Sequence, residues 1–212
     1  MPLTYHPAVF HVNDIAQAMA VIMTPEGSTT AERWEIETPY LADLIAQELT
    51  ITPDTLLLDY GCGIGRLAYE LIQRHNCRVV GVDISPSMRA LSVVYTRSDR
   101  FMSCSHDMLE GLVARGLRFD AALSLWVLQH CATPAQDIAR IRTAIQPDGQ
   151  LFVVNGVFRS VPTLESGWVN DGLDVKAMLA AEFPLVREGK LAREKTTASL
   201  AAHAFWASYR AS

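Results

Sequence analysis

The chain has 212 residues, of which 50% are apolar and 19% are charged. This composition can bury a sizeable core, which excludes a wholly disordered, collagen-like or low-complexity chain. A net charge of −5, with no run of Lys or Arg, argues against general nucleic-acid binding. At about 150 residues per domain, the length fits one domain with an extension.

Neither a membrane segment nor an export signal is expected. The first basic residue is Arg33, and no compact apolar segment follows Met1. The uncharged stretch 121–136 is too short to span a bilayer and is interrupted by polar residues. We therefore expect a cytoplasmic protein without a membrane partner.

The four cysteines form no Cys-x-x-Cys pair, so buried reduced thiols are expected rather than a metal site.

The first 54 residues predict helices. One covers Ile15 to Ile22, and a second is expected to open at Thr38-Pro39 and to run through Leu49. We expect residues 1–54 to form a helical extension or lid, and residues 55–212 to form a second unit.

From Thr55 onward, strand and helix patterns alternate, which is typical of a parallel sheet covered on both faces. The five expected strands cover residues 56–59, 78–83, 100–104, 119–125 and 151–154. The expected helices cover residues 65–75, a segment opening at Ser85-Pro86, residues 108–114 and a segment opening at Thr133-Pro134. After about Asp174 we expect one helix and then two strands, residues 185–191 and 203–209, as an antiparallel hairpin at a sheet edge.

A glycine-rich turn, Asp59-Tyr60-Gly61-Cys62-Gly63-Ile64-Gly65, follows the first strand and opens a helix. Ligands of open α/β sheets bind at this edge. Glycines let the backbone turn tightly and let a ligand approach its amides closely. A tight turn without a ligand is the alternative interpretation.

Two carboxylates beside this turn narrow the choice of ligand. Asp59 would repel a phosphate and attract an ammonium group, and Arg66 occupies the position where a dinucleotide site needs glycine. Asp83 ends the second strand and could accept both hydroxyls of a ribose, or it could cap the following helix. A ligand with a ribose and a cationic end is favoured. S-adenosylmethionine has both, whereas ATP and FAD do not.

Five segments in order carry a family resemblance over roughly residues 52–158: residues 57–65, 81–85, 105–108, 119–130 and 147–151. With them the chain resembles the class I S-adenosylmethionine-dependent methyltransferases of small-molecule type, similar to those of ubiquinone biosynthesis, and more particularly the C-methyltransferases. The resemblance implies an α/β, Rossmann-like doubly wound fold, with a mostly parallel seven-stranded sheet, the antiparallel C-terminal edge hairpin and the helical N-terminal extension. It also implies S-adenosylmethionine as cofactor and in-line methyl transfer to an O, N or C atom of a small-molecule acceptor.

The residues that the resemblance assigns to the cofactor lie at the carboxyl ends of the expected strands or just after them. They are Asp59, Gly61 and Gly63 at the methionine end, Asp83 at the ribose, Ile84 and Met88 near the adenine, Asp107 and the Met108 amide at the adenine edge, and the Leu125 carbonyl near the methionine amine. Asp107 could instead cap a helix, and the role of His106 stays open. Arg33 could reach the ligand carboxylate, or could pair at the surface with Glu32 or Glu35.

Methyl transfer from a sulfonium needs alignment and a dry site, and needs a base only where the acceptor must lose a proton. The candidates for this role lie after the fourth strand: Trp126, Gln129 and His130. His130 is the best candidate for the catalytic base, because its free pKa lies near neutrality. The alternative is that His130 caps the loop after the fourth strand or stabilises the following Thr133-Pro134 turn. The candidates for the acceptor pocket are Tyr5, His6, Trp34, Tyr40, Trp126 and Arg159. The four N-terminal members of this set could instead simply pack on the sheet. Residues 157–171 are expected to form a mobile wall of the pocket.

The absence of certain motifs reduces the number of acceptor classes to consider. No Asn-Pro-Pro-Tyr or Asp-Pro-Pro-Tyr follows the fourth strand, which argues against methylation of the amino groups of DNA bases or of glutamine. A small molecule is therefore the expected acceptor. The alternative function is a non-catalytic nucleoside-binding module of the same fold. A third possible function is that of a dinucleotide dehydrogenase, but Arg66, at the position where a dinucleotide site needs glycine, argues against it.

Overall fold

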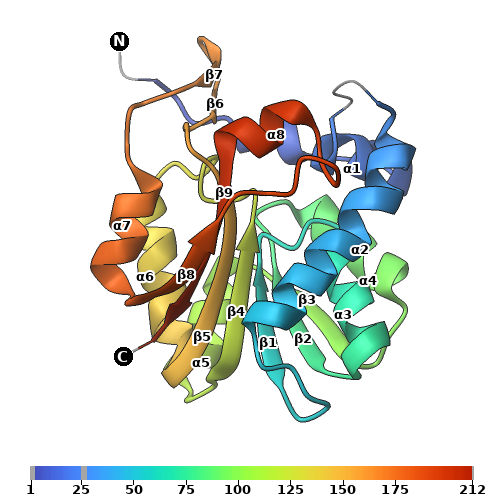
Figure 1. The fold of residues 1–212 in the computed structure, drawn as a ribbon, viewed down its shortest axis with the longest axis vertical. Coiled ribbons are helices and arrows are strands. Elements are labelled where there is room, and N and C mark those ends of the chain that lie inside the picture. Colours follow the sequence, from blue (N-terminus) through green and yellow to red (C-terminus); the bar gives the residue numbers. More distant parts are fainter. Residues whose placement is uncertain (1–2, 25–27, 212) are drawn as a thin grey trace.

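A computed structural model describes residues 3–24 and 28–211 (Figure 1). The strands are β1 (Leu56–Tyr60), β2 (Arg78–Val82), β3 (Phe101–Cys104), β4 (Phe119–Leu125), β5 (Ile145–Gly156), β6 (Val161–Thr163), β7 (Gly167–Val169), β8 (Leu185–Gly189) and β9 (Ala204–Arg210). The helices are the 3-10 helix η1 (Pro7–Phe10) and the α-helices α1 (Ile15–Ile22), α2 (Thr30–Glu48), α3 (Arg66–His75), α4 (Pro86–Thr96), α5 (His106–Ala114), α6 (Pro134–Ala144), α7 (Val175–Glu182) and α8 (Ala198–His203).

Seven strands form one sheet in the order β3-β2-β1-β4-β5-β9-β8. The first five are parallel, and β9 runs antiparallel to both β5 and β8. The predicted α/β, Rossmann-like, mostly parallel seven-stranded sheet is therefore confirmed. From β1 the chain winds outward to β3 and then returns to β4 on the other side of β1. This reversal leaves a crevice at the carboxyl ends of β1 and β4, where ligands of such sheets bind.

Helices cover both faces of the sheet, because neighbouring residues of a buried strand point in opposite directions. Leu57 of β1 packs in a core cluster with Leu41 of α2 and Leu67 of α3. The next residue, Leu58, packs in a second cluster with Ile138 of α6. Figure 1 shows α6 and α7 on one side of the strands and α2 and α3 on the other.

The second N-terminal helix starts earlier than the sequence predicts. It begins at Thr30 and not at Thr38, because Thr29 and Glu32 form a capping box. The Thr29 side chain accepts from the Glu32 amide at 3.2 Å, and the Glu32 carboxylate accepts from the Thr29 amide at 2.9 Å. Pro39 lies inside the helix at the cost of one hydrogen bond, on a segment anchored in the core by Leu41.

Other boundaries of the Rossmann-like unit are close to those predicted. Helices α4 and α6 begin at Pro86 and Pro134 as predicted, although Thr133 makes no side-chain cap bond. Helix α5 starts at His106, two residues earlier than expected, because the Ser105 side chain caps it. Strand β5 extends back to Ile145 and includes the expected turn, since its register with β4 shifts there.

The C-terminal part contains a small hairpin that the sequence analysis missed. Strands β6 and β7 pair with each other within the segment expected to form a mobile wall. The N-terminal residues bind this hairpin: the His6 amide donates to the Pro162 carbonyl at 2.9 Å, and the Leu164 amide donates to the Thr4 carbonyl at 3.0 Å. Figure 1 shows β6, β7 and the N-terminal segment together beyond the carboxyl ends of the parallel strands. The division into units at residue 54 stays a prediction.

Of the two strands predicted to form the edge hairpin, β9 lies inside the sheet and β8 forms one of its edges. The two strands are antiparallel, as predicted, but a connection that contains α8 joins them instead of a tight turn. The adjacent pairing of β9 with β5 places Ala207 and Tyr209 in the core.

Truncation of a central β4 side chain tests the importance of this core. Leu123 is fully buried between the helix layers, and we expect Leu123→Ala to lower the free energy of unfolding by about 2–5 kcal/mol, because a cavity remains. Urea denaturation followed by circular dichroism measures the loss. Val93→Ala on α4, where the side chain is 53% exposed, should change stability by less than about 0.5 kcal/mol. Equal effects of the two substitutions would contradict the packing described.

Candidate active site

The backbone bend after β1 requires glycine. Gly61 and Gly63 have φ angles of +84° and +54°, in the left-handed region that side chains disfavour. A Cβ atom on Gly61 would lie 2.1 Å from Cγ2 of Val127, so there is no room for one. The Gly61 and Cys62 amides donate to the Val82 carbonyl at 2.7 and 2.9 Å, which ties the bend to the end of β2.

Asp83 lies beside this bend and is bound to it. One carboxylate oxygen accepts from the Gly63 amide at 2.9 Å and the other accepts from the Ser85 amide at 2.8 Å. Ser85, not Asp83, is the N-cap of α4, because its hydroxyl accepts from the Met88 amide. Burial raises the pKa of Asp83, and these two hydrogen bonds oppose that shift. A carboxylate has about four acceptor directions, so two remain for a ligand.

Asp59 is the buried carboxylate that lacks a partner. It is 4% exposed, and no group in the described part of the chain donates a hydrogen bond to it. Burial and the nearby Asp83 charge raise the pKa of Asp59 to about 7, while Arg66 lowers it. Arg66 is occupied elsewhere, since it donates to the Thr38 hydroxyl at 3.2 Å and lies over the Trp34 ring at 5.3 Å. A bound cation would therefore complete this site.

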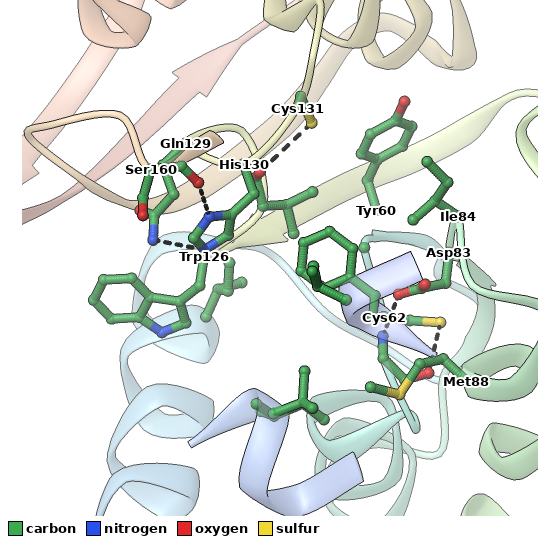
Figure 2. A pocket seen from close by; sticks show the side chains of 18 of the residues that line it. Tyr60, Cys62, Asp83, Ile84, Met88, Trp126, Gln129, His130, Cys131 and Ser160 are labelled. Atoms are coloured by element: carbon green, nitrogen blue, oxygen red, sulfur yellow. Dashed lines mark hydrogen bonds between the residues drawn. The ribbon is translucent and has the colours of Figure 1, made fainter. Parts of the chain in front are cut away.

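A cavity of about 910 Å³ opens at the carboxyl ends of β1, β2 and β4. This volume is near the upper end of the range for ligand pockets, about 300–1,000 Å³. Figure 2 shows Asp83, Ile84 and Met88 on one side of the cavity and Trp126 and His130 on the other. The cavity therefore has one side formed by the glycine bend and the segment that follows β2, and a second side formed by the loop after β4.

The structure brings most of the sequence-predicted residues to this cavity. Its wall includes Tyr5, Arg33, Asp59, Gly61, Gly63, Asp83, Ile84, Met88, Leu125, Trp126 and His130. Six predicted residues do not contribute to the wall: His6, Trp34, Tyr40, Asp107, Met108 and Arg159.

Arg159 was predicted to line the acceptor pocket, but it does not contribute to the cavity wall and its donors are occupied within the protein. Its guanidinium is buried and binds Asp171 through two hydrogen bonds of 3.0 and 2.8 Å. It also donates to the carbonyls of Leu128 and Cys131 at 2.6 and 2.7 Å. Because all these donors are directed into the protein, Arg159 holds the loop after β4 instead of a ligand.

The three N-terminal residues outside the wall have structural contacts. Trp34 packs under the Arg66 guanidinium, the Tyr40 hydroxyl accepts from the Ala192 amide at 2.9 Å, and His6 pairs with β6 through its backbone. Ordinary packing, the alternative that the sequence left open, describes these residues, and Tyr5 differs from them by lining the cavity.

Asp107 and Met108 lie in the first turn of α5, on its exposed side. The Met108 amide donates to the Ser105 hydroxyl at 3.3 Å, so Ser105 is the cap and Asp107 is not. The preceding residue, His106, does line the cavity, and burial lowers its pKa. Adenine recognition by Asp107 and Met108 stays a prediction.

Arg33 is buried in the cavity wall and is not a surface residue. It forms two hydrogen bonds with Glu37, Nε to Oε1 at 2.8 Å and Nη2 to Oε2 at 3.2 Å, and donates to the Thr24 carbonyl. Pairing with Glu32 or Glu35 is therefore wrong. The ion pair leaves the cavity wall neutral at this point.

His130 lies in the wall with both ring nitrogens engaged. Nδ1 is 2.6 Å from the Ser160 carbonyl oxygen, and Nε2 is 3.1 Å from Nε2 of Gln129. Burial lowers the pKa of His130, which favours the neutral ring. The Phe10 and Trp168 rings lie 6.1 and 5.2 Å from the imidazole, between centroids.

Several cavity residues had no signal in the sequence. The Tyr60 hydroxyl donates to Asp137 at 2.5 Å, and Arg140 donates to the same carboxylate oxygen at 3.0 Å. The cavity wall also includes Gln129, from the predicted loop after the fourth strand, and Trp168, from the segment expected to form the wall of the pocket. The partners come from different elements, so only the folded chain reveals them. Among residues 3–24 and 28–211, no three His, Cys, Asp or Glu side chains gather as a metal site would require.

Comparison with known proteins supports the family resemblance. Residues 58–153 match the family described as "Methyltransferase domain". The chain is therefore similar to a methyltransferase domain over slightly less than half of its length. The matched segment contains β2 to β4 and most of β1 and β5, and it includes Asp59, Asp83 and the glycine bend. The predicted resemblance to S-adenosylmethionine-dependent methyltransferases is confirmed.

Curated relatives are similar to this chain over part of its length. It is 29% identical over 135 residues to the "tRNA U34 carboxymethyltransferase" of Cellvibrio japonicus, covering 58% of this chain and 38% of that protein. It is 31% identical over 130 residues to the "Ubiquinone biosynthesis O-methyltransferase" of Bartonella quintana, covering 61% of this chain and 48% of that protein. The chain thus spans less than half the length of these relatives, and the ubiquinone-biosynthesis relative is an O-methyltransferase and not a C-methyltransferase.

A solved structure shares the fold over nearly the whole chain. A geranyl diphosphate methyltransferase in complex with SAM superposes with a TM-score of 0.67 at 14% identity, covering 93% of this chain and 95% of that one.

A tRNA-modifying enzyme is among the relatives, so the sequence argument against nucleic acid is not decisive. Within the described residues, no helix is both long and apolar enough to span a membrane.

The unpaired Asp59 carboxylate predicts a pH-dependent stability. Its pKa is about 7 in the folded protein, against an ordinary value of 3.8. Because the folded chain holds this proton more tightly than the unfolded chain, stability falls as pH rises from about 4 to about 7. We expect Asp59→Asn to raise the melting temperature of the ligand-free protein at about pH 8, by about 2–4 °C for each kcal/mol regained. The gain should vanish near pH 4 in scanning calorimetry, and no gain at pH 8 would contradict the prediction.

Proposed function

We propose that this protein transfers the methyl group of S-adenosylmethionine to a small-molecule acceptor. The observation that carries this proposal is the pair of buried carboxylates, Asp59 and Asp83, beside the glycine bend. An ammonium group suits the unpaired Asp59, and two hydroxyls of a ribose suit the remaining acceptor directions of Asp83. A diphosphate would meet two negative charges instead.

The other predicted cofactor contacts follow from this placement. Ile84 and Met88 would pack on the adenine, and the Leu125 carbonyl would accept from the methionine amine. Asp107 and the Met108 amide would reach the adenine edge from the first turn of α5. Arg33 stays the predicted contact of the ligand carboxylate, but its ion pair with Glu37 leaves no net charge there to attract one.

The second side of the cavity would receive the acceptor. Its aromatic residues Tyr5, Phe10, Trp126 and Trp168 present mostly apolar surface. Among the arginines that line the cavity, Arg33 and Arg140 are paired with carboxylates, and Arg66 lies near the charges of Glu37 and Asp59. A neutral acceptor therefore fits better than an anion. A small molecule also suits the acidic chain better than RNA does.

S-adenosylmethionine, when bound, supplies a methyl group on a sulfonium that needs no further activation. The chain itself has to orient the acceptor and exclude water, which the N-terminal segment and the β6-β7 hairpin would do. His130 would accept a proton where the acceptor carries one on its attacking O or N atom. A C acceptor would need the same proton removal at a different stage.

The alternative is a non-catalytic nucleoside-binding module of the same fold. Protein incubated with methyl-labelled S-adenosylmethionine and a cell extract separates the two functions. We expect label in the small-molecule fraction. Label confined to the RNA fraction would overturn the proposed acceptor class, and cofactor binding without any transfer would favour the binding module.

Removal of the Asp83 carboxylate tests the cofactor site. We expect Asp83→Ala to weaken S-adenosylmethionine binding more than tenfold in titration calorimetry, because a charge-assisted hydrogen bond contributes about 1.5–3 kcal/mol. Asp54→Ala, in the exposed turn before β1, is the matched control and should bind as the wild type does. Folded wild-type protein that fails to bind the cofactor at millimolar concentration would overturn the proposal.

A further inference from the structure

Backbone groups fix the orientation of the Gln129 amide. The Gly156 N–H, which can only donate, points to Oε1 of Gln129. The side-chain nitrogen of Gln129 must therefore face Nε2 of His130, at 3.1 Å. An amide NH₂ group can only donate, so Nε2 of His130 accepts and carries the lone pair.

The other ring nitrogen leads to the same assignment. Nδ1 of His130 lies 2.6 Å from the Ser160 carbonyl oxygen, which can only accept. Nδ1 therefore carries the proton. The two ends of the chain of hydrogen bonds, Gly156 N–H and Ser160 C=O, together select one neutral tautomer.

Gln129 is held by its main chain, so its amide is the part that can move. Its backbone N–H donates to Asn155 Oδ1 at 3.1 Å, and its carbonyl accepts from the Ser160 amide at 2.9 Å. A Cβ on residue 156 would lie 2.8 Å from Gln129 Oε1, so glycine is needed there for this approach. Gln129, His130 and Ser160 all line the cavity (Figure 2).

The surroundings of His130 carry no unbalanced charge that would hold the ring in a protonated form. The nearby cation Arg159 is paired with Asp171. Phe10 and Trp168 contribute uncharged rings, and the adjacent Cys131 thiol has a pKa raised well above its usual range by burial. The ring is therefore available as a neutral acceptor of a proton.

We propose that Gln129 is a positioning residue that keeps Nε2 of His130 unprotonated and reserved for the acceptor's proton. This proposal rests on the proposed function. When an acceptor binds, its O–H or N–H group takes the place of the Gln129 amide. The O–H or N–H bond then breaks, its electron pair stays on the acceptor atom, and the proton binds the Nε2 lone pair. The resulting imidazolium returns the proton to water.

Substitution by glutamate reverses the polarity at this position with almost no change in shape. In Gln129→Glu, one oxygen still accepts from the Gly156 amide, and the other presents an acceptor to Nε2. His130 then binds a proton on both nitrogens, and we expect its pKa to rise by at least one unit. Gln129→Ala, which only removes the donor, should raise it by less. Gln136→Glu, an exposed position in α6, is the matched control and should leave it unchanged.

Nitrogen-15 NMR of the imidazole rings gives this pKa and the tautomer without any substrate. The His130 signals are those lost in His130→Asn. The wild type should show an unprotonated Nε2 and a protonated Nδ1. A wild-type ring protonated at Nε2, or a Gln129→Glu protein with an unchanged His130 pKa, would overturn the proposal.

Labelled methyl transfer to the small-molecule fraction tests the consequence for the reaction. Its rate should fall at low pH as His130 becomes protonated, and Gln129→Glu should move this fall upward by at least one pH unit. At pH values well below both His130 pKa values, the variant should be at least tenfold slower than the wild type. An unchanged pH profile, despite a changed His130 pKa, would overturn the positioning role. Failure of wild-type cofactor binding would instead overturn the proposed function, whatever the NMR result.

Discussion

Two buried carboxylates at the ends of adjacent strands are the constraint on which the site depends. Asp83 is satisfied by the amides of Gly63 and Ser85, whereas Asp59 has no hydrogen-bond donor, and burial raises its pKa to about 7. Like charges in such proximity cost folding stability unless a cation joins them. The glycine bend brings a ligand's cation within reach, because no side chain stands between backbone and cavity.

The features predicted from sequence are those set by local signals. Asp59 and Asp83 each follow a short apolar run that ends at a glycine or a helix cap, so parallel pairing alone brings them to one edge. Strands β1 to β4 and helices α3, α4 and α6 follow from apolar periodicity and from Ser-Pro and Thr-Pro starts. No long-range information is needed for any of them.

The predictions that failed depend either on contacts between residues distant in the sequence or on two competing local signals. Arg159 was expected at the ligand, but Asp171, twelve residues later, and two carbonyls occupy it. Thr38-Pro39 has the composition of a helix start, yet the capping box at Thr29 and burial of the helix override it. Strands β6 and β7 are three residues each, too short for an alternating pattern to be recognised. The Gln129–His130 contact depends on Gly156, which only the sheet brings near.

The place of β9 inside the sheet has a consequence for synthesis on the ribosome. Residues 204–210 separate β5 from β8, so a nascent chain lacking them presents the β5 edge and its apolar neighbours to solvent. The central sheet cannot be completed until residues 204–210 have emerged from the exit tunnel. Before that point the nascent sheet has an exposed strand edge of the kind that chaperones protect from aggregation.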